Sequence, residues 1–198
     1  MIQTDYLVYQ AKSFYNAYIA LVQIHEDCED KMLYSVPVMV YGAFSAEITL
    51  KAILAKNDID YGKEHNLLVL YQMLPESFGM ELLGHLYEKA PEYRDADKCA
   101  EELVLISNAF VDWRYAFEGN PVPALSSRFL AAFAYAAIYT MFSHFNVDLI
   151  PATNIKTDEE IEEMFRQNRE TCIQTNLLKI QQKHKKDAEK NAGITDKE

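Results

Sequence analysis

Glycine and proline are scarce in this chain, and each occurs 6 times in 198 residues. Folds made of many short β-strands need both residues in their turns, so their scarcity argues against such a fold. The chain has instead 13 Tyr and 10 Phe, and 49% of its residues are hydrophobic. This composition is typical of a globular protein with a substantial core. We therefore predict an all-α fold and no β-strand.

Cysteine is also sparse. Cys28, Cys99 and Cys172 are odd in number, far apart and without a Cys-x-x-Cys pair, which excludes a disulfide framework and a zinc site of the usual spacing. The sequence has no glycine-rich phosphate loop, no His-Glu-x-x-His motif and no cluster of histidines with metal spacing. We therefore expect neither a metal ion nor a cofactor.

Long apolar runs and basic stripes are missing too. The most apolar run, residues 129–142, is too short to cross a bilayer, and the N-terminus has no basic region followed by an apolar block. The net charge is −11, so the chain does not attract phosphate backbones in general. These features predict a cytoplasmic protein with no membrane contact.

The segment at residues 35–57 carries an apolar stripe with helical spacing, and most of the remaining helix surface is apolar as well. The stripe consists of Met39, Ala43, Ala46, Leu50 and Ile53. A helix that is apolar nearly all round belongs inside a bundle with neighbours on several sides. Ser35 is a suitable N-cap, and Pro37 would then lie in the first turn.

Apolar periodicity predicts further core helices at about residues 4–26, 65–75, 76–90, 99–118 and 124–146. Residues 91–97 are expected to form a loop. Together the helices predict an up-and-down bundle of about five to six helices over residues 1–150.

The remaining residues, 151–198, are predicted to lie outside the bundle. Thr157 and Glu160 form a capping box for a charged helix. From Lys183 onward the sequence is polar and charged, and we expect a disordered tail.

Glu47 and Lys51 interrupt the apolar surface of the 35–57 helix. They stand at i and i+4 with the glutamate first, which is the favourable order for an ion pair on a helix. One interpretation is a partly buried pair that fixes helix packing, and the other is a functional site.

His65 opens the predicted 65–75 helix. Either its imidazole or the side chain of Asn66 can cap the helix by bonding free backbone N–H groups, and this structural role is the alternative to ligand binding.

Arg114 follows Trp113 of a buried seam and so lies at the edge of that seam. An arginine there can make a bidentate contact with a phosphate or a carboxylate. The alternative is a clamp within the chain, to Glu118, Asp112 or Glu47.

The order of these segments resembles the HEPN superfamily of small α-helical domains. It runs AFSAEITLKAIL on a buried helix, then HNLLVLYQML, then FVDWRYAFE before the last core helix, and the resemblance covers about residues 5–146. The resemblance implies a bundle that dimerises. It also implies a setting in RNA cleavage, toxin–antitoxin or phage-defence systems, or a role as the substrate-binding companion of a nucleotidyltransferase.

The chain departs from the active HEPN ribonucleases, in which an arginine is followed after roughly four to six residues by a histidine that acts on RNA with it. After Arg114 these positions hold Gly119, Asn120 and Pro121, and an amide such as that of Asn120 is no general base. Tyr115 stands where active members often have a smaller polar residue. The other arginines also lack a histidine at this spacing.

Three hypotheses follow. The first is a non-catalytic or weakly catalytic HEPN-like module, a homodimer that binds a nucleotide, an RNA end or a partner protein such as an antitoxin or a nucleotidyltransferase. Its candidate binding residues are Arg114, Tyr115, Glu118, Asn120, Glu47, Lys51 and His65.

The second hypothesis is a metal-independent endoribonuclease toxin with a rearranged site, in which His65 or His144 lies beside Arg114. The third is a purely structural subunit, in which Arg114 is paired inside the protein. Exposure of Arg114 in a groove between two copies would favour binding or cleavage, and its burial against Glu47 or Glu118 would favour the structural role.

Overall fold

The computed structural model of the chain describes residues 4–30, 32–114 and 125–145, together with separate positions between 173 and 185. The chain divides into two compact units, Met1–Val147 and Asp148–Glu198. Within the described part of the first unit, the regular structure is helical and contains no β-strand. This confirms the predicted all-α class.

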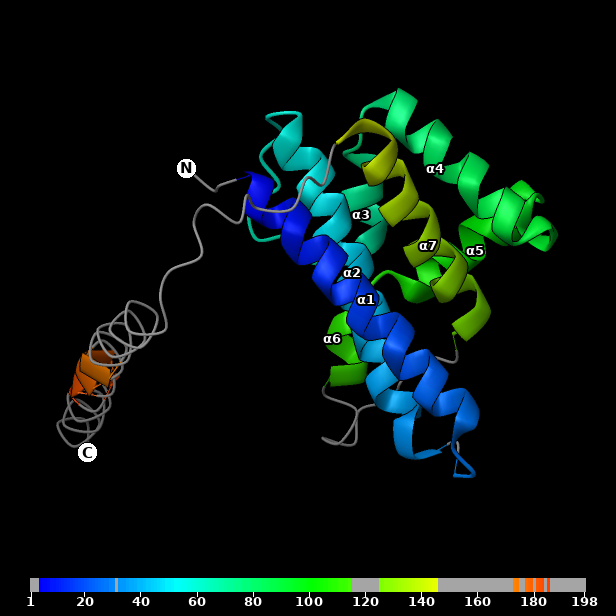
Figure 1. Cartoon of the computed structure of the whole chain (residues 1–198). Coiled ribbons are helices and arrows are strands. Elements are labelled where there is room, and N and C mark those ends of the chain that lie inside the picture. The colour runs from blue at the N-terminus through cyan, green and yellow to red at the C-terminus, as the bar shows by residue number, and fades with distance from the viewer. Residues whose placement is uncertain are drawn as a thin grey trace, which may run out of the picture. The chain divides into compact units, whose positions relative to one another are not determined.

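The first unit is a helical bundle (Figure 1). Its α-helices are α1 (Thr4–Asp27), α2 (Met32–Lys56), α3 (Leu67–Gln72), α4 (Glu76–Lys89), α5 (Ala96–Ile106), α6 (Ala109–Arg114) and α7 (Ser127–His144), with a 3₁₀ helix at Pro91–Tyr93.

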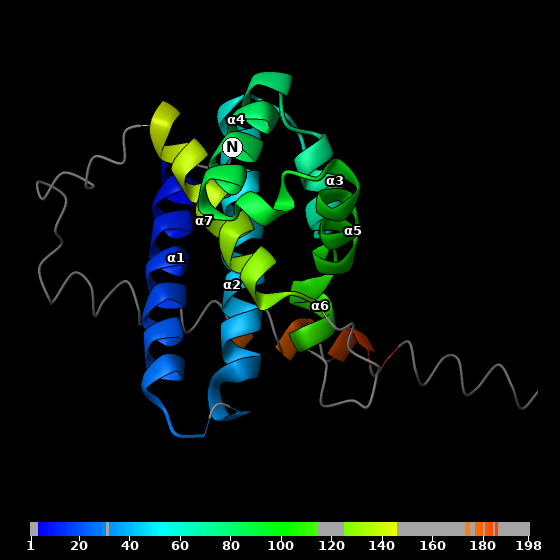
Figure 2. The ribbon, with the colours of Figure 1, turned by 90° about the vertical axis from the view of Figure 1, so that its right-hand side faces the viewer.

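Helix α2 is the centre of the bundle, as its apolar circumference predicts. It contacts α1, α3, α6 and α7, and α1 runs beside it as the other arm of a helical hairpin (Figure 2). Leu50, Ile53 and Leu54 are completely buried. Helix α2 is long and apolar enough to span a bilayer, but 72% of its most apolar window is buried inside the protein. It therefore has the burial of a core helix.

The predicted start of the central helix is wrong by three residues. Helix α2 begins at Met32, whose backbone N–H donates to Oδ1 of Asp30 at 3.1 Å. Ser35 therefore lies inside the helix, where its hydroxyl donates to the carbonyl of Met32 at 2.9 Å. Asp30 is a good capping residue too. The residues that follow it, from Met32 on, are mostly apolar and can form an additional first turn of the helix. Pro37 consequently lies in the second turn.

The helix predicted at residues 99–118 is divided in two. Helix α5 ends at Ile106, and α6 begins at Ala109. Between them the carbonyl of Ser107 accepts a hydrogen bond from the backbone N–H of Leu67 at 2.7 Å. Serine and asparagine are weak helix formers, so this contact with α3 can compete with continuation of the helix at residues 107–108.

The segment expected to be a loop at residues 91–97 is partly helical. It contains the 3₁₀ turn, and Asp95 caps α5 by accepting hydrogen bonds from the backbone N–H groups of Asp97 and Lys98. Because the predicted 99–118 helix is divided into α5 and α6, the described bundle has seven α-helices where about five to six were predicted.

In the second unit, the described positions between 173 and 185 are helical and exposed, among them Ile173, Leu177 and Leu178. The predicted capping box of Thr157 and Glu160 lies outside the described residues.

Candidate functional site

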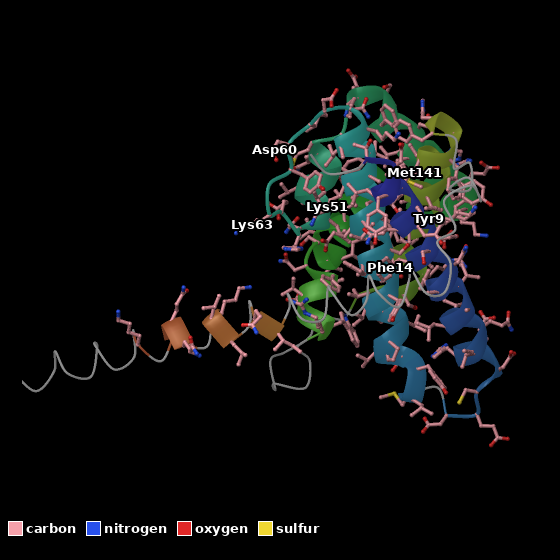
Figure 3. The ribbon with its side chains drawn as sticks, turned by 60° about the vertical axis from the view of Figure 1, so that its left-hand side comes forward. Tyr9, Phe14, Lys51, Asp60, Lys63 and Met141 are labelled. Carbon is pink, nitrogen blue, oxygen red and sulfur yellow. The ribbon has the colours of Figure 1, made fainter. Side chains whose placement is uncertain are left out.

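Glu47 and Lys51 form an ion pair inside the bundle. Lys51 Nζ lies 2.7 Å from Glu47 Oε1, and the two side chains are 9% and 1% exposed. The Lys51 ammonium also lies 5.5 Å from the centre of the Tyr61 ring. Figure 3 shows Lys51 on the side of α2 that faces the loop carrying Asp60 and Lys63. The predicted i, i+4 pair is therefore present and deeply buried.

His65 is the third member of this cluster. Its Nδ1 lies 2.8 Å from the same oxygen of Glu47, while its side chain is 53% exposed. The other oxygen, Glu47 Oε2, is buried without a hydrogen-bond partner among the described residues. Buried carboxylate oxygens are normally hydrogen-bonded, so this atom is an exception. The Glu47/Lys51 pair and His65, which the sequence offered as two separate candidates, thus form one Glu47–Lys51–His65 cluster.

The start of α3 holds His65 in place from the other side. Asn66 is the N-cap and accepts a hydrogen bond from the backbone N–H of Val69 at 3.0 Å, so the cap is the asparagine and not the imidazole. Glu64 accepts hydrogen bonds from the backbone N–H groups of Asn66 and His65, which hold the pKa of its carboxyl below its ordinary value. Asn66 Nδ2 also donates to Asn108 Oδ1 at 3.1 Å. This contact ties the start of α3 to the start of α6.

Arg114 ends α6 and is exposed. Its guanidinium carbon lies 4.8 Å from the centre of the Phe110 ring. Phe110 stacks on Phe44 of α2 with ring centres 4.6 Å apart, and Phe44 meets the edge of Phe14 of α1 at 4.6 Å. The arginine therefore stands on a series of packed aromatic rings that joins α6 to the core.

His65 and Arg114 lie near opposite ends of α6. Asn66, the neighbour of His65, contacts Asn108 directly before the helix, and Arg114 is its last residue. Six residues of α-helix rise about 9 Å along the axis. The Asn66–Asn108 contact and Arg114 thus mark the two ends of one short helix, which itself packs on α2.

Arg114 was considered as a partner of Glu47, but the Glu47 carboxylate contacts Lys51 and His65 instead. Tyr115, Glu118 and Asn120 lie outside the described residues. A clamp between Arg114 and Glu118 therefore stays a prediction.

His144, the other histidine considered for a rearranged site, belongs to a different contact. Its Nε2 lies 2.6 Å from Oε2 of Glu81 on α4, and its ring lies 4.3 Å from that of Phe78. Burial acts to raise the pKa of Glu81, but hydrogen bonds from His144 and Ser143 outweigh it and hold that pKa below its ordinary value. Histidine 144 therefore joins α7 to α4.

The chemistry available at the cluster is that of a carboxylate-held imidazole. When Nδ1 carries the proton and donates to Glu47, Nε2 has a free lone pair and can accept a proton; when both nitrogens are protonated, Nε2 can donate to an anion. Lys51 Nζ contacts the same Glu47 oxygen as the ring, at 2.7 Å. Among the described residues no group of three or more His, Cys, Asp or Glu side chains is placed to hold a metal ion.

Sequence reasoning missed Asn108, Glu64 and the Phe44–Phe110 stack. Helical periodicity relates residues within one helix, whereas the Asn66–Asn108 contact and the Phe44–Phe110 stack join residues from different segments. Glu64 bonds the backbone of the next two residues, in a turn that periodicity does not describe. Glycine 62, at φ 55°, gave a usable signal, because it marks a tight turn that can bring His65 back toward α2.

No protein-family model matches the sequence, and no curated protein or solved structure matches it either. The resemblance to the HEPN superfamily, drawn from short motifs, therefore stays a prediction.

Proposed function

We propose that the chain is a HEPN-like binding module that holds a short phosphate-bearing ligand, a nucleotide or an RNA end, along α6. One observation carries the proposal: exposed Arg114 and half-exposed His65 lie near the two ends of this helix. Arginine binds phosphate with a planar, bidentate fork, and a histidine fixed at Nδ1 presents Nε2 to a second polar group of the ligand.

The charge of the chain supports a short ligand over a long one. At a net charge of −11, an extended nucleic acid is repelled by most of the surface. A nucleotide or an RNA end needs few cationic contacts, and Arg114 at the end of α6 offers one.

The resemblance also supports a homodimer in the cytoplasm that works with a protein partner, an antitoxin or a nucleotidyltransferase, in toxin–antitoxin or phage-defence systems. Tyr139 and Phe142 of α7, 44% and 37% exposed, favour the homodimer because a second copy can cover them.

Fluorescence anisotropy with a labelled RNA tetranucleotide, competed with adenosine monophosphate, tests the binding function. Arg114→Ala should weaken binding at least tenfold and reduce its salt dependence by about one phosphate contact. Arg94→Ala is the matched control, because Arg94 is another exposed arginine. It lies just before the first residue of α5, at the end of that helix away from α6. Absence of binding by the wild type, or equal losses in the two variants, would overturn the proposal.

A second candidate function is metal-independent RNA cleavage with His65 as the general base. The contact of His65 Nδ1 with Glu47 favours it, because a carboxylate at one ring nitrogen orients the imidazole and directs the other nitrogen outward. Cleavage of RNA in the presence of EDTA, lost in both His65→Ala and Arg114→Ala, is the expected result. If the wild type binds RNA without cleaving it, the binding function stands and the ribonuclease is excluded.

A further inference from the structure

A cavity of about 210 Å³ lies between α1 and α7, next to the C-terminal end of α4. Helices α1 and α7 both pack on α2 but touch one another little, as their courses in Figure 1 indicate. Ala131 and Ala132 of α7 line the cavity with short side chains, which leaves the space between the two helices unfilled. None of the residues of α3 or α6 that carry the proposed function lines it.

Three tyrosines form the aromatic part of the lining, namely Tyr15 and Tyr18 of α1 and Tyr135 of α7. Tyr18 is 3% exposed. Its ring packs directly on the backbone of α2, because a Cβ at Gly42 would lie only 3.0 Å from the ring carbon Cε2. Its phenolic hydroxyl is a hydrogen-bond donor that a polar group entering the cavity could meet.

Burial raises the pKa of both Tyr15 and Tyr18 to about 12. Both hydroxyls therefore stay protonated and uncharged at neutral pH. They can donate a hydrogen bond to an anionic or carbonyl oxygen, and they do not repel a negative charge.

Lys89 supplies a positive charge at the cavity. Its Nζ lies 4.9 Å from the centre of the Tyr135 ring, which is a cation–π distance. Arg128 also lines the cavity, but its guanidinium is paired with Glu92, so Lys89 is the cation better able to meet a ligand.

We propose that this cavity binds a small planar aromatic carboxylate, with its ring among the three tyrosines and its carboxylate at Lys89. A cavity of about 150 Å³ accommodates benzene, so the larger volume here has room for an acidic substituent or a fused ring. Aromatic walls favour a planar ring through edge and offset contacts, and the lysine selects a negative charge.

Isothermal titration calorimetry with indole-3-carboxylate tests this site, with neutral indole and non-aromatic cyclohexanecarboxylate as comparison ligands. The wild type should bind indole-3-carboxylate most tightly. Lys89→Met should weaken its binding at least fivefold and leave that of indole unchanged. Lys98→Met is the matched control, because Lys98 Nζ also lies 4.9 Å from a tyrosine ring, that of Tyr93, and neither residue lines the cavity.

Ala131→Leu should abolish binding of both aromatic ligands by filling the cavity, with circular dichroism used to select a folded variant. If that variant does not fold, Ala131→Val offers a smaller filling of the same space. The proposal is overturned if the wild type shows no saturable binding at millimolar ligand or binds cyclohexanecarboxylate equally well. Equal weakening by Lys89→Met and Lys98→Met would also overturn it.

Discussion

Nδ1 of His65 lies 2.8 Å from Oε1 of Glu47, a carboxylate 18 positions earlier in the chain and 1% exposed. The glutamate belongs to the central helix and the histidine to the turn before α3, so the contact fixes that turn to the core. It also leaves about half of the imidazole open to solvent. This relationship joins the structural centre of the protein to its candidate binding surface.

Glu47→Gln should lower the free energy of unfolding by about 3 kcal/mol, because it leaves the buried Lys51 ammonium without its counter-charge. Urea denaturation measures the loss. Glu88→Gln, a substitution of an exposed glutamate on α4, should change stability by less than about 0.5 kcal/mol. The double variant Glu47→Leu/Lys51→Met should recover much of the loss, since an apolar pair can replace a buried ion pair. A near-neutral Glu47→Gln would contradict the buried pair.

His65→Ala should separate stability from function. The side chain is half-exposed and the ion pair of Glu47 with Lys51 remains, so we expect a loss of less than about 1 kcal/mol in urea denaturation. Binding of the RNA tetranucleotide should nevertheless fall. A large loss of stability with unchanged binding would assign His65 a structural role only.

Gly42→Ala and Gly84→Ala should change stability in opposite directions. Both glycines lie inside helices, where alanine is favoured by about 0.5–1 kcal/mol. At Gly42 the new Cβ would meet the Tyr18 ring at 3.0 Å, whereas at Gly84 nothing lies within 4 Å. Thermal unfolding should therefore show a lower midpoint for Gly42→Ala and a higher one for Gly84→Ala. Stabilisation by both substitutions would contradict the close contact of Tyr18 with α2.

Acid should weaken the contact between α4 and α7 through Glu81. Its folded-state pKa lies below the ordinary value of 4.5, so ionised Glu81 stabilises the fold above that pH, and the contribution is lost as the pH falls through the lowered pKa. Denaturation at a series of acidic pH values should show a shallower decline for Glu81→Gln than for the wild type. His144→Ala should flatten the decline as well, because it removes a hydrogen bond that lowers this pKa. Identical slopes would contradict the assignment.

The helices could be predicted from sequence because each depends on residues close together in the chain. The apolar circumference of the 35–57 segment predicts a buried helix. Asn66 is a residue type that often caps helices. The exact start of α2 could not be predicted, since Asp30 and Ser35 are both good capping residues and the sequence does not favour one over the other.

The candidate site was predicted as one pair and several separate residues, and its full arrangement was not. Glu47 and Lys51 stand one helical turn apart, so their pairing follows from spacing. The contact of His65 with the Glu47–Lys51 pair depends on the path of the 57–66 turn. The division of α5 from α6 depends on the hydrogen bond between the Leu67 N–H and the Ser107 carbonyl. These are contacts between distant segments, which periodicity does not report.

The most direct test of the proposed binding function is a titration of ¹⁵N-labelled protein with adenosine monophosphate, followed by two-dimensional NMR. The proposal predicts saturable shifts that are largest at the backbone amides of His65 and Arg114 and along α6, and that disappear in Arg114→Ala but persist in Arg94→Ala. Shifts confined to the cavity between α1 and α7, or no shifts at millimolar nucleotide, would contradict it.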